Sequence, residues 1–123
     1  MEEKMKKSQS EQDYLESILL LSQEHGFVHR VEVANRMNVS QAAVNKAMKL
    51  LQEKGYLYED GKHLYLTEQG EAYAKEIFEK HCILREFFLS LGVPQDVAEQ
   101  DACNFEHVVS DETFAAMKKR LGK

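Results

Sequence analysis

The chain has 123 residues, of which 43% are hydrophobic, and it carries a formal net charge of −5 at pH 7. This length and apolar content exclude an intrinsically disordered chain and suit one compact unit or two small ones. The longest apolar run, residues 18–21, is far too short to cross a membrane. The charged first residues lack the apolar stretch of a secretory signal, so we expect a cytoplasmic protein. In that reducing compartment Cys82 and Cys103 are not expected to form a structural disulfide.

The charge is unevenly distributed along the chain. Between His29 and His63 there are six Lys or Arg residues and four Asp or Glu residues, so this segment carries +2. The remainder carries −7, since the total is −5. The mildly basic segment is compatible with DNA binding, and the acidic remainder suits a site that attracts cations.

The first part of the chain predicts three helices. Residues 10–25 form the first helix, with Ser10 as its cap, and residues 31–37 form a short second one. After a tight turn, Ser40 caps a third helix that runs to residue 54. The residues expected to face the core of these helices are Tyr14, Ile18, Leu21, Val44, Met48 (or Ala47) and Leu51.

The next segment predicts a β-hairpin, and the rest of the chain predicts helices. Two β-prone runs, residues 56–59 and 62–66, flank an Asp-Gly turn. A long helix over residues 67–91 follows, with Gly70 as a place where it could break. Pro94 opens another helix that reaches about residue 108, and Ser110 caps a last helix that ends near residue 121.

The order helix, short helix, turn, helix, hairpin is typical of a winged helix-turn-helix. In that motif the third helix enters the major groove of DNA with its N-terminal residues near the base edges, and the hairpin forms the wing. Small and amide-bearing residues at the start of the third helix suit base and phosphate contacts, and basic residues further along suit phosphates. The candidate DNA-binding residues are Ser40, Gln41, Ala42, Asn45, Lys46 and Lys49 of the third helix and Lys62 and His63 of the wing.

Three sets of metal-ligand residue types stand out. Asp13 and Glu16 are spaced i, i+3 and share a helix face. Cys103, Glu106 and His107 also share one face, and their crowding of anionic groups would be costly without a cation. The long helix contributes a histidine at position 81. Carboxylates, imidazoles and one thiolate together favour a borderline divalent transition metal, and the number of oxygens favours Mn²⁺ or Fe²⁺ over structural zinc.

Several stretches of the sequence together resemble one known family. They are EQDYLESI (11–18), VSQAAV (39–44), LYLTEQG (64–70), KH (80–81) and DACNFEHVVSDE (101–112). The chain resembles the diphtheria toxin repressor family of metal-dependent transcriptional repressors, and more closely its short manganese-transport-regulator branch. The resemblance covers nearly the whole chain in order, and its last stretch is the most specific.

The resemblance implies a mainly α fold. A winged helix-turn-helix DNA-binding domain would occupy residues 1–70, and an all-helical metal-binding and dimerisation domain residues 71–123. The expected protein is a homodimeric repressor, not an enzyme, that Mn²⁺ or Fe²⁺ activates. It would bind a near-palindromic DNA operator and control genes of divalent-metal homeostasis. The implied metal ligands are Asp13, Glu16, His81, Cys103, Glu106 and His107, with Glu99 as a further candidate.

The sequence combines features of two branches of that family. Asp13 and Glu16 are typical of the manganese branch, whereas Cys103 is typical of the iron branch. Arg85 stands where the iron branch has a Glu, and Lys62 or His63 replaces an arginine expected in the wing. Part of an apolar set on the long helix is a candidate dimer interface: Phe78, Ile83, Phe87, Phe88 and Leu91.

Two other functions fit the residues less well. A metal-independent winged-helix regulator that senses a small organic ligand would use the acidic and histidine residues only as scaffold. A small di-iron enzyme could use the same carboxylates and His81, but the paired Glu-x-x-His motifs of such helical bundles are missing.

Overall fold

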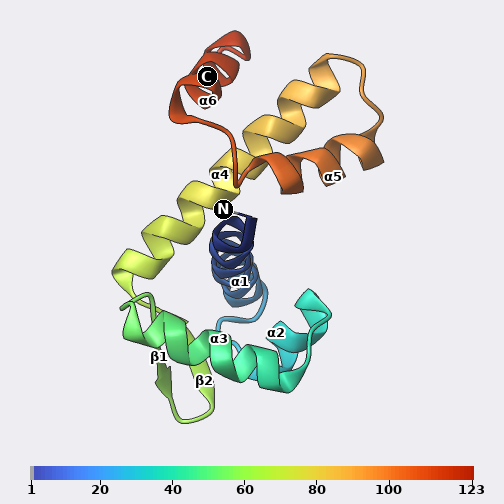
Figure 1. Cartoon of the computed structure of the whole chain (residues 1–123). Coiled ribbons are helices and arrows are strands. Elements are labelled where there is room, and N and C mark those ends of the chain that lie inside the picture. Colours follow the sequence, from blue (N-terminus) through green and yellow to red (C-terminus); the bar gives the residue numbers. More distant parts are fainter. Residues whose placement is uncertain (1) are drawn as a thin grey trace. The chain divides into compact units, whose positions relative to one another are not determined.

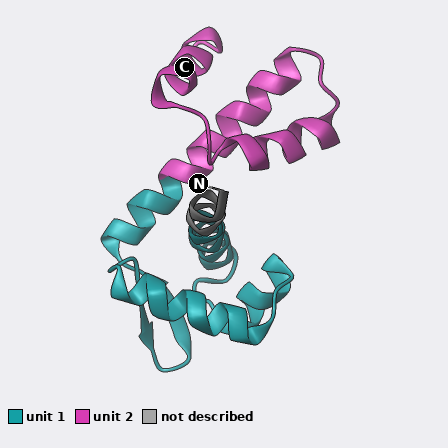
Figure 2. Ribbon diagram, viewed as in Figure 1, with its two compact units in different colours: residues 1–75 teal, residues 76–123 magenta. Residues whose placement is uncertain are grey.

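A computed structural model describes residues 2–123 of the chain, with side chains from residue 10 on. Its elements, in chain order, are α1 (Glu2–His25), α2 (Arg30–Met37), α3 (Gln41–Glu53), β1 (Leu57–Asp60), β2 (His63–Leu66), α4 (Glu68–Ser90), α5 (Gln95–Phe105) and α6 (Asp111–Arg120) (Figure 1). They form two compact units, residues 1–75 and 76–123, and the division falls inside α4 (Figure 2). We call them unit 1 and unit 2. In the described part of the chain, no helix has both the length and the apolar character that crossing a membrane requires.

Unit 1 contains the expected helices and hairpin around one core. The residues predicted to face inward are buried, with Val44 and Met48 of α3 fully so and Leu51 1% exposed. Strands β1 and β2 pair antiparallel, with Leu57 opposite Leu66 and Asp60 opposite His63. Val28, between α1 and α2, adds an isolated bridge to Leu64, so the core extends under the hairpin. The winged helix-turn-helix fold is therefore confirmed.

Helix α1 begins earlier than the sequence predicted. The expectation that Ser10 caps it is wrong, because the helix runs from Glu2 and Ser10 lies inside it. Glu, Lys, Met and Gln dominate residues 2–9, and all four have high helix propensity, so nothing in that stretch stops the helix. The predicted apolar stripe is correct, since Tyr14, Ile18 and Leu21 are buried.

Helix α4 is continuous, without a break at Gly70. A Cβ atom at this position would lie 1.8 Å from the backbone oxygen of Tyr56, so only glycine lets the two backbones approach this closely. Thr67 closes the same junction: its hydroxyl donates to the Gly55 oxygen at 2.7 Å and accepts from the Gly70 amide at 3.0 Å. The glycine therefore serves packing at the base of the hairpin rather than a turn.

Unit 2 has its own small core. Leu84 and Phe88 of α4 pack with Ala98 and Ala102 of α5. Around this cluster lie the partly buried Phe87, Val93, Val109 and Met117. Pro94 precedes the first residue of α5 as its N-cap. Ser110 caps α6 as expected, since its hydroxyl accepts the Thr113 amide at 3.2 Å.

Candidate metal centre and DNA-binding surface

His81 lies on the buried face of α4. Ile77, His81, Leu84 and Phe88 follow one another at helical spacing, and all four are buried. An imidazole on such a face needs polar partners, because an unsatisfied buried nitrogen would cost on the order of 1–3 kcal/mol. Its partners come from α5 and the residues just after it.

Helix α5 presents those partners because small residues let it approach α4. Ala98 and Ala102 are fully buried, and neither adds bulk between the helices. Glu99 and Cys103 each follow one of these alanines by one position, and Glu106 is the C-cap residue of α5. The helix spacing thus directs one thiol and two carboxyl groups toward His81.

Both nitrogens of the His81 ring are engaged. Its Nδ1 lies 3.0 Å from Oε2 of Glu106, and its Nε2 lies 2.8 Å from Oε1 of Glu99. The Cys103 sulfur lies 3.8 Å from Nδ1. The other carboxylate oxygen of Glu106 lies 3.3 Å from Nε2 of His107, so Glu106 connects the two histidines.

Burial makes this cluster depend on a positive charge. The Glu106 side chain is only 1% exposed, and an isolated carboxylate there would be very costly. Hydrogen bonding to Glu106, reinforced by Glu99, raises the pKa of His81 from 6.5 to about 9, although burial opposes the shift. Without a metal, His81 therefore holds a proton at neutral pH that offsets the charge of the carboxylates.

The donor set of unit 2 fits a divalent transition metal. His81, Glu99 and Cys103 each offer one ligand atom, and these atoms all lie within 4.8 Å of one another. Two ligands of one ion bound at about 2.0–2.3 Å lie up to roughly 4.5 Å apart, so small side-chain movements would suffice. Imidazole, carboxylate and thiolate together suit manganese, iron or zinc rather than calcium or magnesium.

Glu99 has a second partner, Arg85, which stands where the iron branch of the family has a Glu. Arg85 Nη1 lies 3.5 Å from Oε2 of Glu99, while Oε1 faces His81. The arginine therefore already supplies a positive charge to one oxygen of this candidate ligand. The two remaining ligand candidates, Asp13 and Glu16, lie half-buried on α1 in unit 1, three positions apart.

The candidate DNA-binding residues of α3 are arranged along its outer side. Ser40 is the N-cap, and its hydroxyl accepts the Ala43 amide at 3.1 Å. The next five candidates are exposed: Gln41, Ala42, Asn45, Lys46 and Lys49. The opposite side of the helix is buried in the core, so this side is available to a partner.

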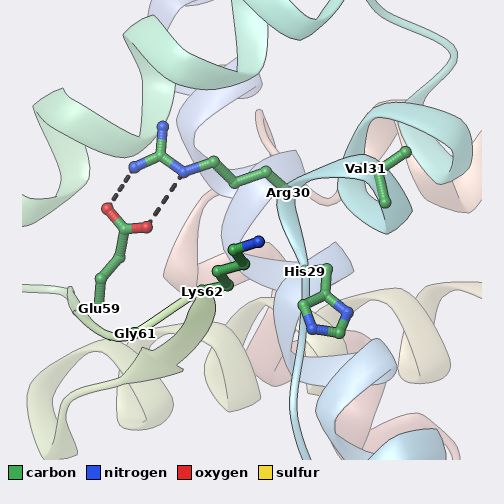
Figure 3. Close-up of a pocket in the computed structure, with 6 residues that line it drawn as sticks. All are labelled: His29, Arg30, Val31, Glu59, Gly61 and Lys62. Carbon is green, nitrogen blue, oxygen red and sulfur yellow. Dashed lines mark hydrogen bonds and ion pairs between the residues drawn. The ribbon is translucent and has the colours of Figure 1, made fainter.

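The two wing candidates differ in their surroundings. Lys62 is exposed in the two-residue turn between β1 and β2, beside a pocket that His29, Arg30, Val31, Glu59 and Gly61 also line (Figure 3). His63 is half-buried, and its ring stacks on Phe27 with centroids 4.5 Å apart. This stacking indicates that His63 helps to pack the wing, a structural role that the sequence did not indicate.

Sequence reasoning missed one residue of this surface, Arg30. It is the first residue of α2, and it bonds to Asn45 of α3 and Glu59 of β1. These partners are 15 and 29 positions away, so no local pattern could have pointed to them. The only available signal was an arginine at the start of a short helix that faces the wing.

Comparison with known proteins identifies both units. Residues 6–64 match the iron dependent repressor N-terminal DNA binding domain, and residues 67–123 match the iron dependent repressor metal binding and dimerisation domain. The transcriptional regulator MntR of Escherichia coli O6:H1 is 39% identical over 86% of this chain and 69% of its own length. An HTH-type transcriptional regulator of Methanocaldococcus jannaschii is 37% identical over 90% of this chain and 91% of its own.

Solved structures agree with this assignment. A manganese-dependent transcriptional repressor in complex with manganese is 30% identical with a TM-score of 0.81 and covers 91% of this chain. The IdeR protein of T. acidophilum, 23% identical with a TM-score of 0.79, shares the fold. This chain spans only about half of those two, 52% and 54% of their lengths.

These relatives decide between the functions considered above. The named relatives are transcriptional regulators rather than enzymes, and a metal-binding domain does not favour a metal-independent sensor of organic ligands. The chain belongs to the iron-dependent repressor family, which includes the diphtheria toxin repressor and manganese-regulator types, and is a metal-dependent transcriptional repressor of that family.

Proposed function

We propose that this chain is a homodimeric repressor that Mn²⁺ or Fe²⁺ activates and that controls genes of manganese or iron homeostasis. The observation that carries the proposal is the cluster around the buried His81 and Glu106 in unit 2, which also includes the His107 imidazole, the partly buried Cys103 thiol and the half-exposed Glu99 carboxylate. Such a set is costly for a purely structural role, because it needs a cation or a proton to offset its charge.

The proposed ligands include residues of both units. His81, Glu99, Cys103, Glu106 and His107 belong to unit 2, and the family resemblance adds Asp13 and Glu16 of α1. When bound, the cation neutralises the negative charge of its carboxylate ligands. Metal binding would change DNA affinity only as far as the metal binds the DNA-binding state of the protein better than its other states, typically by about 1–3 kcal/mol.

The DNA-binding role falls to α3 and the wing. The exposed Gln41, Ala42 and Asn45 at the start of α3 face base edges, and Lys46 and Lys49 face phosphates. Ser40 reaches a phosphate while it caps the helix, and Lys62 and His63 contribute the wing contact. The operator is near-palindromic, since a symmetric dimer presents two copies of α3 about 34 Å apart or a multiple of that.

The dimer interface is best placed on apolar residues that unit 2 leaves exposed. Of the set expected from the sequence, Ile83 and Phe88 are buried at 5% and 9% exposure and belong to the core of the monomer. Leu91, at 66%, is exposed. Other apolar residues of unit 2 are also exposed and are further candidates for the interface: Leu89, Val97, Phe105 and Val108.

Operator binding measured across a panel of divalent metals under anaerobic conditions tests the proposal. Mn²⁺ or Fe²⁺ should increase DNA affinity strongly, and Glu106→Gln should weaken metal binding by about 100-fold or more while the fold is retained. Glu112→Gln is the matched control, because Glu112 is exposed on α6 and should leave activation unchanged. Wild-type activation in the Glu106→Gln variant would refute the site.

A further inference from the structure

The Arg30 side chain is held by two elements of unit 1 at once. Its Nε donates to Oε2 of Glu59 at 3.2 Å, and its Nη2 makes a second bond to Oε1 of the same carboxylate (Figure 3). Its Nη1 donates to Oδ1 of Asn45 on α3 at 2.8 Å. The guanidinium thus links the start of α2 to the wing and to the proposed recognition helix.

Glu59 fixes the position of this guanidinium. The Arg30 and Glu59 side chains are each only 29% exposed, and their two parallel bonds set the plane of the guanidinium. Gln52 of α3 donates a further hydrogen bond to Oε1 of Glu59 at 2.8 Å. Bonding to Arg30 holds the pKa of Glu59 below its ordinary value, so the carboxylate stays charged at neutral pH.

The contact with Arg30 determines which way the Asn45 amide points. A guanidinium has only hydrogen-bond donors, so the atom of Asn45 that faces it must be the oxygen, whichever way the amide is drawn. The NH₂ group of Asn45 then lies on the other side of the amide. Asn45 is exposed on α3 in the turn that follows the Ser40 cap, where recognition helices reach base edges.

We propose that Arg30 is a positioning residue for sequence recognition: it holds the Asn45 oxygen so that Asn45 offers its NH₂ group to DNA and recognises a hydrogen-bond acceptor in the major groove. This inference rests on the proposed DNA-binding role of α3. In this arrangement Asn45 only donates a hydrogen bond to the base. An Asn whose amide is not held in place can instead make two hydrogen bonds to adenine, one as donor and one as acceptor.

The chemistry of the bases makes the inference specific. In the major groove guanine offers O6 and N7, thymine offers O4 and adenine offers N7, whereas cytosine offers only its N4 donor. On the strand that Asn45 contacts, one position in each half-site should therefore disfavour cytosine. Replacing Asn45 by aspartate keeps the shape and the bond to Arg30 but turns an acceptor toward the DNA, so cytosine or adenine should become preferred there.

The first test is selection of operators from a randomised DNA pool by the full chain with saturating Mn²⁺. The wild type should disfavour cytosine at one half-site position by about tenfold, and Asn45→Asp should reverse this preference at that position alone. Tolerance of cytosine by the wild type at every position, or an unchanged preference in Asn45→Asp, would overturn the inference. A wild-type chain that selects no operator with any metal would refute the proposed function as well.

The second test separates positioning from simple affinity. Arg30→Met removes the donors but keeps the length of the side chain, and Arg36→Met removes the same charge from the other end of α2, where Arg36 pairs with Glu24 at 3.3 Å. Arg30→Met should flatten the base preference at the Asn45 position, whereas Arg36→Met should leave it intact. If Arg30→Met weakens binding to all sequences equally, Arg30 is a general affinity residue and the inference fails.

A measurement on the unmutated protein does not depend on the folding of variants. If the selected base is adenine, its 7-deaza analogue lacks the N7 acceptor; if it is guanine, 7-deaza-6-thioguanine lacks N7 and weakens the acceptor at position 6; if it is thymine, 4-thiothymine replaces the O4 acceptor by a weaker one. The analogue should lower affinity by about threefold to tenfold at the Asn45 position and should not do so in the Asn45→Ala variant. An equal loss in the wild type and in Asn45→Ala would contradict the assignment.

Discussion

The two units place their polar chemistry in opposite ways. In unit 1 the functional candidates of α3 and the wing tip lie at the surface over a mainly apolar core, and the ion pair of Arg30 with Glu59 is partly exposed. In unit 2 the central candidates lie inside, and Glu106 and His81 are among the most buried polar residues of the described chain, whereas the Glu99 side chain is half-exposed. A charged group at the surface stays hydrated and costs little free energy without a partner. A buried charged group loses its hydration, so it is stable only with an opposite charge beside it. Unit 1 therefore suits a large anionic ligand, and unit 2 a small cation.

The largest expected effect is a loss of stability, caused by a substitution in the core beneath the DNA-binding surface. Leu51→Ala removes a side chain that is 1% exposed and should lower the free energy of unfolding by about 2–5 kcal/mol. Its neighbour Leu50 is 47% exposed, so Leu50→Ala should cost far less. Urea denaturation of the two variants measures the difference. Equal losses would mean that the burial of α3 is not what holds unit 1 together.

The next prediction concerns protons in unit 2. Because the pKa of His81 is raised to about 9, its ion pair with Glu106 stabilises the metal-free fold fully below pH 6.5 and is lost as pH rises toward 9. A metal ion that binds His81 must displace this proton. Metal affinity should therefore increase with pH across that range, by up to about tenfold per pH unit for the one proton displaced from His81.

Calorimetry in buffers of different ionisation enthalpy would count the released protons. His63→Gln, a change in unit 1, should leave the number unchanged. An affinity that does not vary between pH 6.5 and 8.5 would show that the metal does not compete with a proton at His81.

A smaller effect tests the electrostatics of unit 1. Lys46→Ala removes an exposed cation from α3, and the loss of one phosphate contact should lower the slope of log K against log salt by about one. Lys75→Ala is a suitable control, because Lys75 pairs with Glu71 on α4 at 2.9 Å. The slopes come from operator binding at several salt concentrations, and an unchanged slope for Lys46→Ala would argue against a phosphate contact.

The smallest expected effect concerns two serine N-caps, one in each unit. Ser40 and Ser110 cap α3 and α6 in the same way, so each alanine variant should lose about 1 kcal/mol of stability. Only Ser40→Ala should also weaken operator binding under conditions where the protein stays folded. Thermal denaturation and DNA binding measured together check this, and equal DNA affinities for the two variants would remove Ser40 from the DNA-binding surface.

Local patterns in the sequence predicted most of the fold. Helix caps such as Ser40 and apolar spacing such as Val44, Met48 and Leu51 involve neighbouring residues, and the structure agrees with them. The role of Gly70 was not predictable, because it depends on the Tyr56 backbone from another segment. The start of α1 was missed because a good capping residue lay inside a stretch that also favours helix.

The candidate sites show the same limit. Residue types and helical spacing predicted candidate ligands on α4 and α5, and the structure brings several of them together, but the sequence did not predict that Glu106 lies next to both His81 and His107. The contact of Glu106 with His81 depends on how closely α4 and α5 pack, which the small Ala98 and Ala102 allow. Arg30 illustrates the extreme case, since both of its hydrogen-bond partners, Asn45 and Glu59, are brought near it only by folding.

The junction of Gly55, Tyr56, Thr67 and Gly70 has a consequence for how this protein can change over evolution. The residues just before and just after the hairpin are hydrogen-bonded to each other, since Thr67 Oγ1 contacts both Gly55 and Gly70. The helices on either side are therefore joined independently of the hairpin tip. Insertions at the turn of Gly61 and Lys62 would cost mainly loop entropy, so the tip can grow longer while the rest of the domain keeps its shape.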